Sequence, residues 1–320
     1  MKILVLLKKR LCVSFLIFVL SLFLVIRIVF FTPVFSDETI YINMAKALAT
    51  GLLPYKDFFY AHPPIQLILL APLASLGNFY LLKIFISIIG IFCIFLTYLV
   101  AEKIFDEKVA FTASSALLIY PGFLIFGNLG MGTFEALTFF LLSFYSLLKK
   151  RIFLSSIFLT LAVYTRYLAL FLTPFLLIYV FKYQRKNFTP FLLYLLSTNI
   201  LIFLLFYGFF GKNFLDYTIF YHFQVNIGLL KVQYSEQYFV LGLFTTFICL
   251  TSLLYSCLKR DRTIFLFSFY PLFYDLCVLF IFKQVVYHYF TFVIPLTFIA
   301  FGATFLKSKL FIVKFSLALF

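Results

Sequence analysis

Long apolar runs recur along this chain of 320 residues from Leu11 to the C-terminus, and short clusters of lysine and arginine separate them. A run of about 20 apolar residues can cross the hydrocarbon core of a bilayer, which is roughly 30 Å thick. The composition agrees, because 65% of the residues are hydrophobic and the mean hydropathy is +1.12, whereas soluble domains are nearer half apolar. Helices satisfy their own backbone hydrogen bonds in lipid. The sequence therefore predicts an all-α, polytopic membrane helical bundle of about 10–11 transmembrane helices.

The basic clusters predict how the chain crosses the membrane, because lysine and arginine collect on the cytoplasmic side. If residues 8–10 lie in the cytoplasm, alternate crossings also place the clusters at 149–151, 182–186 and 259–262 there. The predicted crossings are 11–31, 81–101, 109–127, 134–148, two within 152–181, 188–209, 237–258, 263–282 and 288–306. Topology thus explains the net charge of +15, so we expect a multi-pass cell-membrane protein with a cytoplasmic N-terminus and no nucleic-acid partner.

The outer segment 32–80 is neither a plain loop nor a full crossing. Ile40, Met44 and Leu48 recur at helical spacing, and the pattern stops at Gly51. This arrangement predicts an amphipathic helix on the extracytoplasmic membrane surface. A second short apolar piece, 65–76, follows two prolines, which suit a helix N-terminus. We therefore expect two juxtamembrane helices in the first outer loop.

The acidic pair Asp37-Glu38 opens the first of these helices in a chain with only 11 acidic residues. A carboxylate beside lipid can act as a general base, because desolvation raises its pKa. The alternative is a helix cap followed by a solvated acid that the helix dipole favours. Glu135 similarly opens the crossing 134–148 after a glycine-bearing loop, where it is either an interfacial acid or a substrate-positioning group. Asp37 and Glu135 could also share a divalent metal ion through oxygen ligands.

Arg166 lies at the predicted tip of the nearly chargeless hairpin 152–181. A guanidinium there either snorkels to lipid headgroups or holds a departing phosphate. His288 starts a later crossing and could assist that phosphate, or it is a structural histidine at the interface. Arg27 and Lys83 lie near the outer ends of their crossings, and we expect both to snorkel. Asp275, within a crossing, is either functional or hydrogen-bonded to a neighbouring helix.

The first outer loop resembles that of the GT-C class of membrane glycosyltransferases, most closely protein O-mannosyltransferases and lipid A aminoarabinose transferases. The matching residues are Asp37-Glu38, Tyr41, Ala45, Gly51, Pro54-Tyr55, Asp57 and His62-Pro63-Pro64. Weaker similarities are Glu135, Thr165-Arg166-Tyr167, and His288-Tyr289 followed by Pro295. The resemblance covers residues 10–185 well and is thin beyond them. It implies a polyprenyl-phosphate-linked sugar donor and transfer on the extracytoplasmic side.

Residues and resemblance together predict an inverting hexosyl- or pentosyltransferase that moves a sugar to a hydroxyl of a protein, lipid or glycan acceptor. The expected catalytic residues are Asp37, Glu38 and Glu135, the expected donor-phosphate ligands are Arg166, His288 and Tyr289, and the expected substrate-loop residues are Tyr55, Asp57 and His62. We expect one domain over 1–320, with a motif-bearing half at 1–185. The variable half at 186–320 is a candidate for binding the carrier lipid. The alternatives are a lipid-linked-sugar flippase or transporter and a noncatalytic membrane subunit.

Overall fold

A computed structural model describes residues 36–127, 129–225, 236–282 and 287–308. The predicted crossing 11–31, together with Arg27, lies outside these residues. The helices are α2 (Ser36–Ala49), α3 (Ile65–Ala74), α4 (Phe79–Ile104), α5 (Glu107–Ile119), α6 (Pro121–Phe126), α7 (Thr133–Leu148), α8 (Ile152–Thr165), η1 (Tyr167–Leu172), α9 (Thr173–Tyr183), η2 (Arg185–Asn187), α10 (Phe188–Phe210), α11 (Lys212–Leu215), η3 (Asp216–Phe220), α12 (Tyr221–Val225), α13 (Glu236–Lys259), α14 (Arg262–Ile281), η4 (Tyr287–Val293) and α15 (Ile294–Lys307).

The predicted all-α membrane bundle is confirmed, since the described part of the chain has no strand beyond one isolated bridge between Pro54 and Phe58. Five helical segments there are long and apolar enough to cross a membrane, and four shorter apolar helices accompany them. Two of the shorter ones, α8 and the η1–α9 segment, form the predicted hairpin, which turns at Arg166. The predicted crossing 109–127 is broken, because Pro121 begins the separate helix α6.

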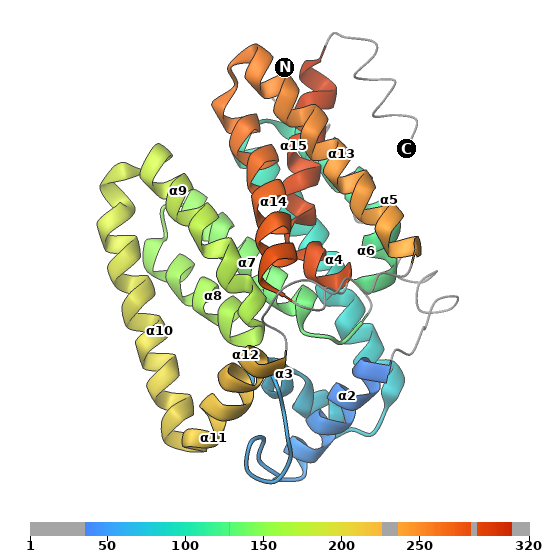
Figure 1. The fold of residues 1–320 in the computed structure, drawn as a ribbon, viewed down its shortest axis with the longest axis vertical. Helices are drawn as coiled ribbons and strands as arrows, with labels where there is room; N and C mark the ends of the chain where they lie inside the picture. Colours follow the sequence, from blue (N-terminus) through green and yellow to red (C-terminus); the bar gives the residue numbers. More distant parts are fainter. Residues whose placement is uncertain (1–35, 128, 226–235, 283–286, 309–320) are drawn as a thin grey trace, which may run out of the picture.

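The two ends of the bundle differ in character (Figure 1). Helices α2, α3, α11 and α12 lie together at the lower end in that view. The basic clusters meet at the other end, where Lys182 donates to the Arg262 carbonyl and Lys307 pairs with Asp261 at 2.9 Å. This grouping agrees with the predicted alternation of crossings. The side of the membrane that each end faces remains a prediction.

Local sequence signals set the juxtamembrane helices. Helix α2 ends just before Gly51, which adopts a φ of +97° that a residue with a Cβ rarely takes. Helix α3 starts directly after Pro64, and Asn78 caps α4 by accepting hydrogen bonds from the backbone N–H groups of Tyr80 and Leu81. The predicted short helices of the first outer loop are therefore present.

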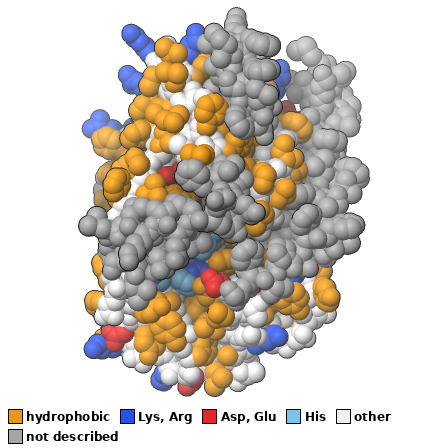
Figure 2. Space-filling model, turned by 45° about the vertical axis from the view of Figure 1, so that its right-hand side comes forward, with side chains coloured by type: hydrophobic (Ala, Val, Ile, Leu, Met, Phe, Trp, Pro, Cys, Tyr) orange, Lys and Arg blue, Asp and Glu red, His pale blue; other side chains and the backbone are white. Residues whose placement is uncertain are grey.

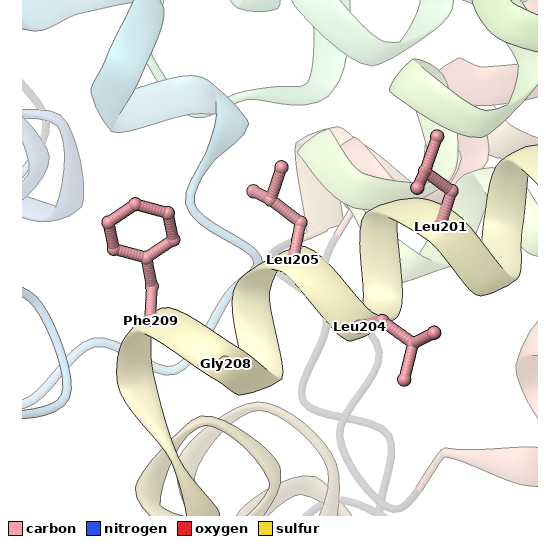
Figure 3. Close-up of a pocket in the computed structure, with 5 residues that line it drawn as sticks. All are labelled: Leu201, Leu204, Leu205, Gly208 and Phe209. Carbon is pink, nitrogen blue, oxygen red and sulfur yellow. The ribbon is translucent and has the colours of Figure 1, made fainter.

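Helix α7 lies in the core and packs against α4 and α8. Its phenylalanines interlock with aromatic rings of α9 and α14, as where Phe144 contacts Tyr179 edge to face. Helix α10 is more peripheral and is tied to α8 by a hydrogen bond between the hydroxyls of Thr160 and Thr198. Figure 3 shows an apolar pocket on α10, and none of the residues that line this pocket is ionisable. The pocket is lined by Leu201, Leu204, Leu205, Gly208 and Phe209.

Candidate active site

A glycine-bearing loop between α6 and α7 is the point at which three separate segments meet. The backbone N–H of Gly130 donates to Glu38 of α2 at 2.9 Å, and the Gly130 carbonyl accepts from Gln66 of α3 at 2.7 Å. The next carbonyl, that of Met131, accepts from the guanidinium of Arg166. The loop backbone at Gly130 and Met131 is therefore engaged by the protein's own side chains.

Glu38 and Lys83 form a buried ion pair at this loop. Their side chains are separated by 2.7 Å, and the residues are 0% and 3% exposed. The expectation that Lys83 snorkels is therefore wrong, because its ammonium turns inward to a carboxylate. Glu38 Oε1 accepts hydrogen bonds from both the Lys83 ammonium and the Gly130 N–H. Glu38 Oε2 is buried and has no hydrogen-bond partner among the described residues.

Arg166 is held from two directions at the turn between α8 and η1. Besides its bond to Met131, its guanidinium carbon lies 4.9 Å from the centre of the Tyr41 ring, a cation–π contact from α2. The residue is only 6% exposed, so it does not snorkel to headgroups. Within the described ranges, its Nε is buried without a hydrogen-bond partner. Arg166 therefore keeps an unused donor inside the cluster of polar side chains that surrounds the glycine loop. This group of side chains is called the cluster below.

Glu135 lies in the first turn of α7 and is 2% exposed. Among the described residues neither carboxylate oxygen has a hydrogen-bond partner of good geometry, although the backbone N–H groups of Gly132 and Glu135 lie close by. Arg166 and Glu38 are both within electrostatic range. The carboxylate thus has acceptor capacity within electrostatic range of the buried arginine.

Arg166 is within electrostatic range of all three histidines of the chain, which come from distant segments. The Tyr41 hydroxyl lies 3.0 Å from His62 Nε2, and the His62 ring stacks on that of His222 with 5.3 Å between centroids. His222 donates from Nε2 to the Ala61 carbonyl at 2.6 Å. Burial and, next, the charge of Arg166 hold the pKa of His62 well below its usual value, so this ring is neutral at pH 7.

Asp37 and Tyr289 lie on the outer side of the cluster. Asp37 is exposed at the start of α2, and the Tyr289 hydroxyl is within electrostatic range of Asp37, Arg166 and Tyr41. The neighbouring His288 ring packs edge-on against Tyr289 at 4.7 Å between centroids. Figure 2 shows histidine, basic and acidic side chains next to one another on one face of the molecule. The predicted base and the predicted phosphate ligands therefore share one region.

The predicted substrate-loop residues Tyr55 and Asp57 make local contacts. Tyr55 is buried, with its hydroxyl donating to the His62 carbonyl and its ring edge-on to Phe214. Asp57 is exposed and accepts from the Leu53 backbone N–H at 2.7 Å. Both contacts shape the loop that carries His62. Their proposed contact with substrate remains a prediction.

Similarity to known proteins is found in the fold and not in the sequence, since no family model and no curated protein matches this chain. ArnT from Cupriavidus metallidurans superimposes over 93% of the chain, with a TM-score of 0.71 and 12% identity when bound to undecaprenyl phosphate, and 0.67 and 11% in the apo state. The oligosaccharyltransferase of Archaeoglobus fulgidus in the apo form superimposes over 97%, with a TM-score of 0.61 and 14% identity. The chain has the fold of GT-C glycosyltransferases.

The predicted resemblance to the GT-C class is thus confirmed at the level of the fold. The chain corresponds to 60% of the length of each ArnT chain and 52% of the oligosaccharyltransferase chain. Within this GT-C fold the cluster lies where the juxtamembrane helices meet the glycine loop. The described residues include no group of three or more His, Cys, Asp or Glu side chains that could hold a metal ion. The suggested metal site at Asp37 and Glu135 stays a prediction.

Several members of the cluster were not predicted from the sequence. Tyr41 was noted only as part of the family resemblance, and Gln66, Lys83 and His222 were not expected in the site. Lys83 carried the clearest signal, since a lysine within an apolar helix needs either an exit to the interface or a partner. His222 carried no local signal, because its contact with the Ala61 carbonyl spans 161 residues of chain.

Proposed function

We propose that this GT-C-fold protein is an inverting glycosyltransferase that moves a sugar from a polyprenyl-phosphate donor to an acceptor hydroxyl at the extracytoplasmic membrane surface. The observation that carries the proposal is the buried Arg166, whose Nε has no hydrogen-bond partner among the described residues and which is within electrostatic range of the buried carboxylate of Glu135. A fixed guanidinium suits a phosphate, because its planar donors match the phosphate oxygens. The undecaprenyl phosphate bound to the ArnT structure supports this donor class.

The proposed reaction is a single displacement at the anomeric carbon. Asp37 accepts the proton of the acceptor hydroxyl while that oxygen bonds to the anomeric carbon, and the bond from this carbon to the phosphate oxygen breaks. The electron pair of the broken bond stays on the departing lipid phosphate, whose growing negative charge Arg166 stabilises. Exposure of Asp37 leaves it open to an incoming acceptor. Its proximity to Tyr289, which Arg166 also reaches, supports a shared reaction space.

Other members of the cluster are assigned to substrate orientation. His288 and Tyr289 have ring N–H or hydroxyl donors that suit the departing phosphate. Glu135, with unfilled oxygens, suits hydroxyl groups of the sugar or acceptor. Holding reacting groups in line can lower a barrier by several kcal/mol. Carrier-lipid binding by residues 186–320, for which the apolar face of α10 is available, is part of the same proposal.

The test is sugar transfer by purified protein supplied with polyprenyl-phosphate sugars, compared with Asp37→Asn and a matched control. Asp37→Asn removes the base with almost no change in shape, so we expect transfer to fall by at least about 10²-fold. Asp216→Asn makes the same chemical change at a partly exposed aspartate outside the cluster, whose Oδ2 lies 4.0 Å from Lys212 Nζ. Its transfer rate should match wild type. Full activity in Asp37→Asn would refute the assignment of the base.

A further inference from the structure

The ion pair between Lys83 and Glu38 joins three parts of the site. Lys83 belongs to α4, Glu38 belongs to α2, and the same Glu38 oxygen that lies 2.7 Å from Lys83 accepts the Gly130 N–H at 2.9 Å. Glu38 directly follows Asp37 in the first turn of α2. The direction in which Glu38 points therefore determines how α2 is turned about its axis, and so where Asp37 lies.

The same pair also bears on Arg166 through a closed ring of contacts. Glu38 of α2 accepts from Gly130, and the carbonyl of the next residue, Met131, accepts from Arg166. The guanidinium of Arg166 in turn lies over the ring of Tyr41, which also belongs to α2. Glu38 and Tyr41 are three residues apart, a spacing that places them on one face of the helix. Any rotation of α2 would therefore move both contacts together.

Stability alone is a weak reason for such a pair. Taking two charges out of water is costly, and well-packed apolar residues of similar size often stabilise a fold equally well. A buried ion pair does fix geometry, because its two partners must meet at a hydrogen-bonding distance. Here the geometry that it fixes is the position of α2 relative to the glycine loop.

We propose that Lys83 is a positioning residue for sugar transfer, which holds Glu38 against Gly130 and thereby sets Asp37 and Arg166 at their working separation. The catalytic part of this inference, the effect of Lys83 on sugar transfer, rests on the proposed function. Its structural part, the dependence of the Glu38–Gly130 contact on Lys83, stands on geometry alone. Lys83 touches no substrate in this proposal, so its loss should lower kcat by a larger factor than it raises the KM for the donor.

The test compares Lys83→Met, the double variant Lys83→Met/Glu38→Gln, and the control Lys46→Met, which makes the same change at an exposed position on α2. Lys83→Met leaves a buried carboxylate without its counter-charge, and kcat should fall by about 10- to 100-fold because small misplacements are costly. The double variant removes both charges, and its glutamine oxygen can still accept from Gly130. We expect its kcat to be at least tenfold higher than that of Lys83→Met.

Amide hydrogen exchange in residues 129–133 gives a second measurement that needs no activity. Exchange should be faster in Lys83→Met, near wild type in the double variant, and unchanged in Lys46→Met. The inference is overturned if Lys83→Met keeps wild-type kcat, or if the double variant has a kcat no higher than that of the single one. Unchanged exchange in Lys83→Met would overturn it as well. Absence of sugar transfer by the wild-type protein would instead refute the proposed function. The exchange measurement would still test whether the Glu38–Gly130 contact depends on Lys83.

Discussion

Gly132 offers the sharpest test of how the glycine loop controls the arginine. It precedes α7 with a φ of +78°, and a Cβ built there would lie 2.6 Å from Gln66 Oε1 and 2.7 Å from Arg166 Nε. Real Cβ atoms essentially never approach other heavy atoms this closely, so both side chains must move relative to the loop. Gln66 is bonded to the Gly130 carbonyl and Arg166 to the Met131 carbonyl. Gly132→Ala should therefore break at least one contact of the loop.

The magnitude follows from two separable costs. A left-handed backbone costs a residue with a Cβ roughly 1–2 kcal/mol, and forcing a methyl group into a packed site adds roughly 1–3 kcal/mol. Gly132→Ala should thus lower the free energy of unfolding by about 2–5 kcal/mol. Gly77 is a matched control, since its φ is +68° but a Cβ there would have nothing within 4 Å. Gly77→Ala should show the backbone cost alone, about 1–2 kcal/mol.

The assay combines thermal unfolding of purified protein in detergent with binding of a polyprenyl phosphate. Gly132→Ala should bind the lipid phosphate at least tenfold more weakly than Gly77→Ala, because Arg166 is displaced. Equal unfolding and equal binding in the two variants would show that the loop tolerates a side chain. That result would refute the argument that close backbone approach fixes the arginine.

Two further predictions concern residues around Arg166. Arg166→Lys keeps the positive charge but loses the planar group over Tyr41, so kcat/KM for transfer should fall by about tenfold or more; unchanged kcat/KM would show that charge alone suffices. His62→Gln tests the pH dependence of stability. The pKa of His62 in the folded protein lies well below its usual value, so as the pH falls from 7 to 5 this histidine takes up a proton only in the unfolded chain. Wild-type protein should lose up to about 2 kcal/mol more stability than the variant over this interval, measured by unfolding at both pH values; equal losses would contradict the reasoning.

The parts of the fold with a local cause could be predicted from the sequence. The glycine at residue 51 marks the end of α2, and the hairpin turns at Arg166 as the basic clusters on both sides require. The crossing predicted at 188–209 corresponds to α10, Phe188–Phe210. The break at Pro121 also has a local cause, the proline itself, but the apolar run continues through it and favours a single crossing.

Pairings between distant segments could not be predicted in this way. Lys83 was expected to snorkel because it lies near the end of an apolar helix, and its partner Glu38 lies 45 residues earlier in the chain. The sequence identified Glu38 as an acid of the site without indicating where it would point. The neighbours Asp37 and Glu38 are in fact separated by burial, one exposed and one fully enclosed. Helical geometry explains this, since adjacent side chains diverge by about 100°.

The distribution of unfilled hydrogen-bonding groups limits what the cluster can bind. The loop backbone at Gly130 and Met131 is already occupied by protein side chains. Among the described residues, the unfilled buried groups of the cluster lie on Arg166, Glu135, Glu38 and His288. Recognition therefore comes from side chains: Arg166 is a buried cation beside Glu135, and Glu38 is already paired with a second buried cation, Lys83. A ligand that carries an anionic group next to several hydroxyls matches both the arginine and the carboxylates. Phosphate oxygens accept from the guanidinium, and hydroxyls donate to carboxylates. Under the proposed function, a simple phosphate would bring no hydroxyl to Glu135, so we expect a sugar phosphate to bind more tightly than a lipid phosphate alone.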